Sequence, residues 1–155
     1  MKYRTIKKLN NWLKENGFEN ISAYRDKEFA YLYKDSQEKI SVGDGIPYIS
    51  FQDLYKIVEN SLEYSTDSST LCFLHELGHY STWEEFGILD ELFDRAVRKI
   101  IGSIDRLLPN LKVYSITEKI YHRLPQEKRA TMWAVDYINN NRKETEKLQE
   151  ILLDK

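Results

Sequence analysis

Two histidines and a glutamate lie within the short sequence HELGH at residues 75–79. His75 and His79 are four residues apart, and on an α-helix that spacing places both side chains on one face, with Cβ atoms roughly 5–6 Å apart. Two imidazoles at this separation can bind one tetrahedral metal ion. The pattern H-E-x-x-H therefore predicts a zinc site, although an exposed polar stripe on a helix could contain the same residues.

Glu76 would lie beside the open coordination position of such a site. Zinc lowers the pKa of a bound water to roughly 7, and a nearby carboxylate can take the proton. The flanking residues Leu71, Phe73 and Leu77 are apolar, which predicts a largely buried helix where unpaired polar side chains would be costly. Gly78 costs roughly 1 kcal/mol relative to alanine inside a helix. We therefore expect close approach of a strand or a substrate backbone to compensate.

A catalytic zinc site usually has three protein ligands and a water. Glu85 stands at the position where one known downstream spacing would place the third ligand, but Thr82 replaces the glycine that lets the chain turn back. His122 could replace a carboxylate ligand or stabilise an oxyanion, and a packing role is the alternative. Cys72 shares a helix face with the two histidines and could bind metal, although a buried apolar thiol is the commoner role.

Glu127 is the favoured third ligand. Pro125 suits the first position of a helix, which places Glu127 in the first turn. Ala130 and Ala134 follow on the same helix face, so a carboxylate is aligned with an apolar stripe that permits close approach of another helix. A charge directed inward needs a partner, and zinc would be one. The alternative is that Glu127 caps its own helix and interacts with the helix dipole.

These residues carry a resemblance to a known family. HELGH, followed by E-x-x-A-x-x-W-A at Glu127, Ala130, Trp133 and Ala134, resembles the ImmA/IrrE-type zinc metallopeptidases of bacteria, phages and mobile elements. That family has phenylalanine at the position of Trp133. The resemblance covers about residues 68–140 and implies a divergent, phage- or mobile-element-like member. It also implies an α+β, zincin-like fold, in which a small antiparallel sheet packs against the HExxH helix with several further helices.

The composition indicates a soluble globular protein. The 155 residues are 41% hydrophobic and 31% charged, which suits one domain over residues 1–155. The net charge of -2 gives no electrostatic reason to expect a nucleic acid. A single cysteine, no apolar run of signal-peptide length and no membrane-spanning stretch predict a cytoplasmic protein without a membrane partner.

The apolar periodicity predicts a helical N-terminus, a short sheet and then mostly helices. We expect two or three strands between about residues 20 and 50, and a helical active-site part over about 51–155. The expected helices have apolar residues at helical spacing and start or stop signals at their ends. They cover Ile6 to Leu13 before Gly17, Leu54 to Leu62, a helix beginning near Ser68 with Asp67 or Ser68 as its cap, Ile88 to Leu108 with one face on the core, 115–122, Pro125 to Asn140, and 142–155.

The motif thus predicts a zinc-dependent peptidase that hydrolyses a peptide bond with a metal-activated water, and the family resemblance implies that its substrate is a specific intracellular protein. His75, His79 and Glu127 bind Zn²⁺, and Glu76 is the catalytic base. The alternative is a non-enzymatic protein-binding module on a zincin-like scaffold. Besides His122, three tyrosines could donate to an oxyanion, namely Tyr80, Tyr121 and Tyr137. Asp136 could orient a histidine, although solvent exposure is the alternative.

Overall fold

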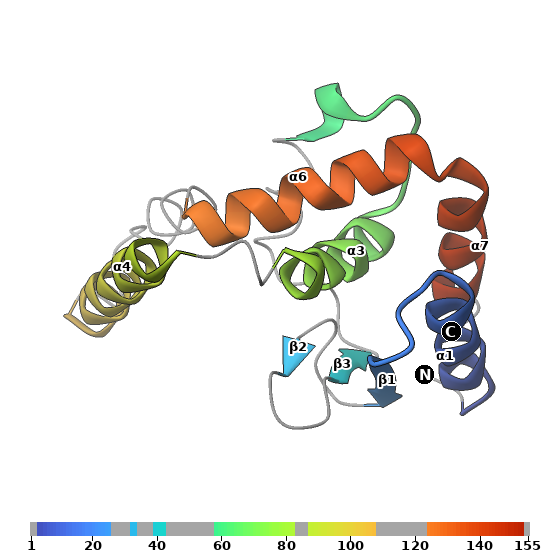
Figure 1. Cartoon of the computed structure of the whole chain (residues 1–155), viewed down its shortest axis with the longest axis horizontal. Coiled ribbons are helices and arrows are strands. Elements are labelled where there is room, and N and C mark those ends of the chain that lie inside the picture. The colour runs from blue at the N-terminus through green and yellow to red at the C-terminus, as the bar shows by residue number, and fades with distance from the viewer. Residues whose placement is uncertain are drawn as a thin grey trace.

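The computed structural model describes residues 3–25, 32–33, 39–42, 58–82, 87–107 and 124–153. Its elements, in chain order, are α1 (Tyr3–Glu15), β1 (Ser22–Arg25), β2 (Leu32–Tyr33), β3 (Lys39–Val42), the 3₁₀ helix η1 (Glu59–Ser61), α3 (Ser68–Ser81), α4 (Ile88–Leu107), α6 (Pro125–Asn140) and α7 (Arg142–Leu153). Helices predominate beside one small sheet, which is a mixed α+β architecture (Figure 1). Among the residues described, no helix is both long enough and apolar enough to cross a membrane.

The sheet has three strands in the order β1-β3-β2. The expectation of short strands between residues 20 and 50 is confirmed, but the expected antiparallel sheet is wrong for one of its two pairs. β2 pairs antiparallel with β3, whereas β1 pairs parallel with β3, with Ser22 opposite Lys39. The reason is that β1 adds to the far edge of β3 instead of pairing with β2, its neighbour in sequence, and such a long-range choice leaves no local sequence signal.

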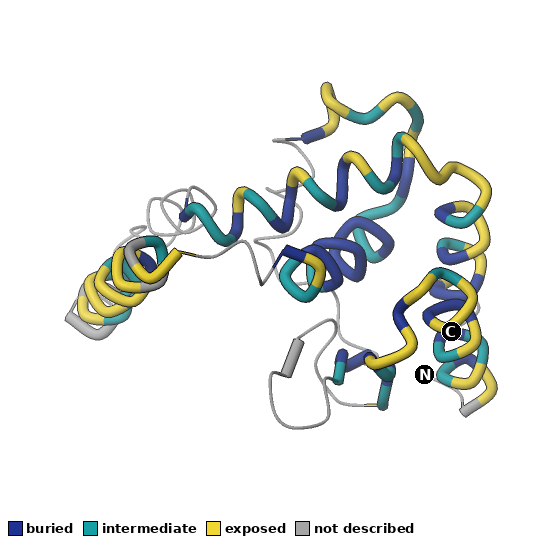
Figure 2. The backbone as a smooth tube through the Cα atoms, in the orientation of Figure 1, coloured by how far each residue is buried: buried dark blue, intermediate teal, exposed yellow. Residues whose placement is uncertain are grey.

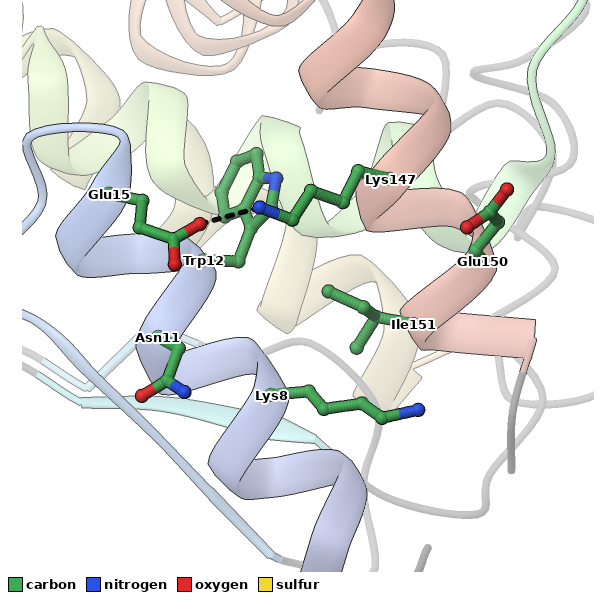
Figure 3. Close-up of a pocket in the computed structure, with 7 residues that line it drawn as sticks. All are labelled: Lys8, Asn11, Trp12, Glu15, Lys147, Glu150 and Ile151. Carbon is green, nitrogen blue, oxygen red and sulfur yellow. Dashed lines mark hydrogen bonds and ion pairs between the residues drawn. The ribbon is translucent and has the colours of Figure 1, made fainter.

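Helices α1 and α7 form one end of the molecule. Trp12 of α1 is fully buried, and its indole nitrogen donates to the Glu144 carbonyl of α7 at 2.9 Å. Gly17 adopts a φ of 84°, a left-handed conformation that glycine reaches without strain, and it ends α1 as predicted. Figure 3 shows a hollow between the two helices, in which Lys147 forms an ion pair with Glu15.

Helices α3 and α6 cross at close range in the middle of the molecule (Figure 1). Asp67 caps α3, because its carboxylate accepts from the backbone amides of Ser69 at 2.7 Å and Thr70 at 3.0 Å. A Cβ placed on Gly78 would lie 2.9 Å from the Ala130 Cα and 3.0 Å from its carbonyl carbon. The compensating close approach that we expected at Gly78 therefore comes from the backbone of α6 and not from a strand or substrate.

The packing of α4 differs from the prediction. The helix itself is confirmed, but several of its described apolar side chains are exposed and do not lie on the core as predicted. Ile88 is 77% exposed, and Leu92, Phe93 and Ile100 are each more than half exposed. Figure 2 shows exposed residues along much of this helix. Among the side chains of α4 that the structure describes, the buried one is Asp94. Ion pairs join α4 to α6, so its polar edge faces α6, and the exposed apolar side chains remain on the surface.

The remaining expectations are met in part. Helices α6 and α7 are confirmed, and α3 begins at Ser68 as predicted. Of the helix expected between Leu54 and Leu62, residues 54–57 lie outside the described residues. Val58 is helical and η1 follows it directly, whereas Leu62 is already extended, with φ -87° and ψ 128°. The break after Leu108 and the helix expected over 115–122 also lie outside the described residues.

Candidate metal centre

The α3–α6 crossing brings three metal-ligating residues together. His75 and His79 project from α3, and Glu127 projects from the first turn of α6. One ligand atom from each residue lies within 4.8 Å of the others, so the three could hold a metal ion. These are the three residues that the sequence predicted. The contact between Gly78 and Ala130 fixes the separation of the two helices, and so it sets the distance between the histidines and the carboxylate.

The distances within the cluster fit a single ion. The Nε2 atoms of His75 and His79 lie 3.1 Å and 3.3 Å from Glu127 Oε2. Two ligands about 2.0–2.1 Å from a tetrahedral zinc ion are about 3.3–3.4 Å apart. The His79 separation equals this value, and the His75 separation is slightly shorter. Glu127 does not cap its own helix, because α6 has no side-chain hydrogen bond at its N-cap and the carboxylate turns toward α3. Its place in the first turn is favourable for the helix dipole as well.

Thr131 determines which nitrogen of His75 is available to a metal. The Thr131 hydroxyl donates to the Glu127 carbonyl at 2.7 Å, so its oxygen is left to accept from His75 Nδ1 at 3.1 Å. With its hydrogen on Nδ1, neutral His75 presents a lone pair at Nε2. That lone pair faces the anionic Glu127 Oε2, so the contact requires a proton or a metal ion between the two atoms.

The charges of the cluster stabilise one another. Burial alone would raise the pKa of Glu127, but hydrogen bonds and charge interactions with His75 and His79 hold it well below its usual value. Burial alone would lower the pKa of His79. The hydrogen bond and charge of Glu127, together with the charge of Glu76, outweigh burial and raise it. The site therefore favours an ionised carboxylate with a cation at the imidazoles.

Two residues of α4 also lie beside the cluster. Arg98 Nη2 donates to Glu127 Oε1 at 2.8 Å and lies 3.9 Å from Asp94 Oδ2. Burial raises the pKa of Asp94 more than the Arg98 charge lowers it. Among the residues described, both oxygens of Asp94 and the Nδ1 atom of His79 are buried without a hydrogen-bond partner. Buried polar groups left in this state are rare and concentrate at functional sites.

The other candidates fall outside the cluster or outside the described residues. Cys72 is fully buried in the apolar core, which supports the structural role. Tyr137 donates to Asn16 at 2.8 Å, and Asp136 is exposed, so neither contacts the site. Glu76 is half-buried beside His75, and Tyr80 packs at the edge of the core. The residues whose placement is not described are Glu85, Tyr121 and His122.

The sequence interpretation missed Thr131, Arg98 and Asp94. Thr131 had a detectable signal, because it lies one turn after Glu127 and is a polar residue among the apolar ones of that face. Arg98 and Asp94 had none, since two opposite charges four residues apart usually lie on a solvated helix face. Only the tertiary position of α4 brings them to the site.

Comparison of the chain with protein-family models, with curated proteins and with solved structures gave no match. The resemblance to the ImmA/IrrE-type metallopeptidases is therefore a prediction carried by the two motifs alone, HELGH at 75–79 and the later pattern that begins at Glu127.

Proposed function

We propose that the protein is a zinc-dependent peptidase with a zincin-like active site, acting on a peptide bond of a protein substrate. The observation that carries the proposal is the arrangement of three ligand atoms around one point: His75 Nε2 and His79 Nε2 both face Glu127 Oε2. Two imidazoles and one carboxylate are a ligand set of catalytic zinc sites. The order H-E-x-x-H with a distant glutamate supports a peptidase over other zinc hydrolases.

Each residue has a defined task in this proposal. His75, His79 and Glu127 would hold the ion, and Thr131 keeps the hydrogen of His75 on Nδ1 so that Nε2 can coordinate. A bound zinc ion would supply Lewis acidity for the carbonyl oxygen and acidify a water. Glu76 would accept the proton of that water as its oxygen bonds to the carbonyl carbon, and would transfer the proton to the amine as the C–N bond breaks.

The test separates metal binding from catalysis. The zinc-loaded wild type and Glu76→Gln are incubated with a library of peptides from digested cell protein, and newly formed N-termini are identified by mass spectrometry. We expect new termini with the wild type and none with Glu76→Gln, while both bind the same amount of zinc. Equal cleavage by the two proteins would exclude Glu76 as the base.

A second function, a non-enzymatic protein-binding module, is favoured by one observation. Ile88, Leu92 and Phe93 are exposed on one side of α4, and exposed apolar patches of this kind mark interaction sites. In that case the zinc ion would stabilise the scaffold only. The absence of any cleavage by the zinc-loaded wild type, in the peptide library and in intact cell protein, would favour this module.

A further inference from the structure

The two carboxylate oxygens of Glu127 have partners on different helices. Oε2 faces the two histidines of α3. Oε1 accepts a hydrogen bond of 2.8 Å from Arg98 Nη2 of α4, and the same guanidinium nitrogen lies 3.5 Å from Gln126 Oε1. Because each oxygen is held separately, the carboxylate cannot rotate without losing one of these contacts.

This division matters for a metal ligand. A carboxylate can coordinate through one oxygen or through both, whereas a tetrahedral site with two histidines and an open position takes only one oxygen from it. A guanidinium bonded to Oε1 occupies that oxygen and fixes the plane of the carboxylate. Arg98 thereby leaves Oε2 as the single ligand atom of Glu127.

Burial strengthens this arrangement. The side chain of Glu127 is 2% exposed, and that of Arg98 is 37% exposed, so the guanidinium reaches from the surface to a carboxylate that water cannot hydrate. Asp94, one turn earlier on α4, lies 3.9 Å from the same nitrogen of Arg98. Its carboxylate is a second acidic neighbour of the same guanidinium nitrogen, and this helps to hold Arg98 in place.

We infer that Arg98 is a positioning residue that holds Glu127 as a one-oxygen metal ligand, an inference that rests on the proposed zinc site. Arg98 belongs to a helix whose polar edge faces α6 and several of whose apolar side chains are exposed. The ion pair with Glu127 accounts for this orientation of the helix, because it places a fixed cation beside the third ligand. In the absence of Arg98, both oxygens of Glu127 would be available to the ion.

The experiment uses Co²⁺ as a spectroscopic probe on the full chain. Visible absorption is recorded during titration of the metal-free wild type, Arg98→Ala, Arg98→Lys and Arg129→Ala. Arg129→Ala is the matched control, because Arg129 forms a second ion pair between the described residues of α4 and α6, with Asp90 at 3.2 Å, and its side chain is about as exposed as that of Arg98. Circular dichroism of each variant establishes that it is folded, and Arg98→Gln serves if Arg98→Ala is not.

We expect an intense, four-coordinate Co²⁺ spectrum for the wild type and Arg129→Ala. Arg98→Ala should lose intensity, because a second oxygen enters the coordination sphere, and Arg98→Lys should regain most of it by restoring a cation at Oε1. Identical spectra for the wild type and Arg98→Ala would overturn the inference. So would an equal change in Arg129→Ala, which would assign the effect to the docking of α4. If the wild type binds no Co²⁺, the proposed zinc site itself fails.

Discussion

The two ends of α6 have different surroundings. Toward its C-terminus, Ala134 and Ile138 are fully buried in an apolar cluster shared with α1, α3 and α7. In its first turn, Glu127 is equally buried but meets two histidines and an arginine. Apolar burial stabilises a fold by itself, whereas a buried carboxylate gains little net stability from its partners. The difference separates an apolar end of α6 that stabilises the fold from a polar end whose side chains could hold a metal ion.

A core substitution should produce the largest loss of stability. Phe73 of α3 is fully buried and packs against Trp12 with ring centroids 6.3 Å apart. Phe73→Ala should lower the free energy of unfolding by about 3–5 kcal/mol. His79→Ala should lower the free energy of unfolding by a smaller amount, because His75 and Arg98 still pair with Glu127. Urea unfolding of the metal-free proteins measures both, and a greater loss for His79→Ala would contradict the division between the two ends of α6.

Zinc should stabilise the protein only through the polar end of α6, where Glu127 meets the two histidines. At a free zinc concentration one hundred times the dissociation constant, binding adds about 2.7 kcal/mol to the free energy of unfolding. We expect this gain in the wild type and in Glu76→Gln, and its loss in His79→Ala. Thermal unfolding with buffered zinc measures it, and an equal gain in His79→Ala would show that zinc binds elsewhere.

The contact between Gly78 and Ala130 lies between the polar and the apolar end of α6. Gly78→Ala should destabilise the protein by about 1–3 kcal/mol, because the new methyl group would lie 2.9 Å from the Ala130 Cα. It should also weaken zinc binding by moving α3 away from Glu127. The matched control is Gly102→Ala in α4, where nothing lies within 4 Å of the added Cβ and helix propensity predicts a gain of up to about 1 kcal/mol. Unchanged stability in Gly78→Ala would contradict the close crossing.

The smallest expected effect is the pH dependence of the metal-free protein. The pKa of His79 is raised from 6.5, so its stabilising contribution is complete below 6.5 and is lost as the pH rises through the folded-state value. The pKa of Glu127 is lowered from 4.5, so its contribution is complete above 4.5 and is lost as the pH falls through its folded-state value. Their combined contribution is therefore largest between about pH 4.5 and 6.5.

This pH effect is measured as the difference in unfolding free energy between the wild type and His79→Ala from pH 4 to 9. The difference should decrease toward alkaline pH. The stabilisation by added zinc should increase over the same range, because the ion displaces a proton from the histidine. A difference that does not change with pH would contradict the pairing of His79 with Glu127.

Local sequence signals predicted the helices that carry the site. The cap at Asp67, the proline at the start of α6 and the spacing of His75 and His79 were enough to place the ligands on two helices. The two alanines of α6 indicated a close approach to another helix. Such features are readable because they depend on neighbours a few residues away.

The remaining features depend on contacts between distant segments. The periodicity of α4 predicted its helix and an apolar face, but not that Asp94 and Arg98 would be the residues directed to the site. The parallel pairing of β1 with β3 is likewise decided by which edge a strand joins. The sequence pattern of an amphipathic helix shows that it has two faces, and only its tertiary partners determine which face is buried.

The most direct test of the zinc site is metal content by mass spectrometry on protein purified without chelator. The wild type, His79→Ala, Glu127→Ala and the control Glu76→Gln are compared. We predict about one zinc ion per chain in the wild type and in Glu76→Gln, and little in the other two, because each lacks a ligand. Equal zinc in all four proteins, or none in the wild type even after zinc is added back, would contradict the assignment of His75, His79 and Glu127 as a metal site.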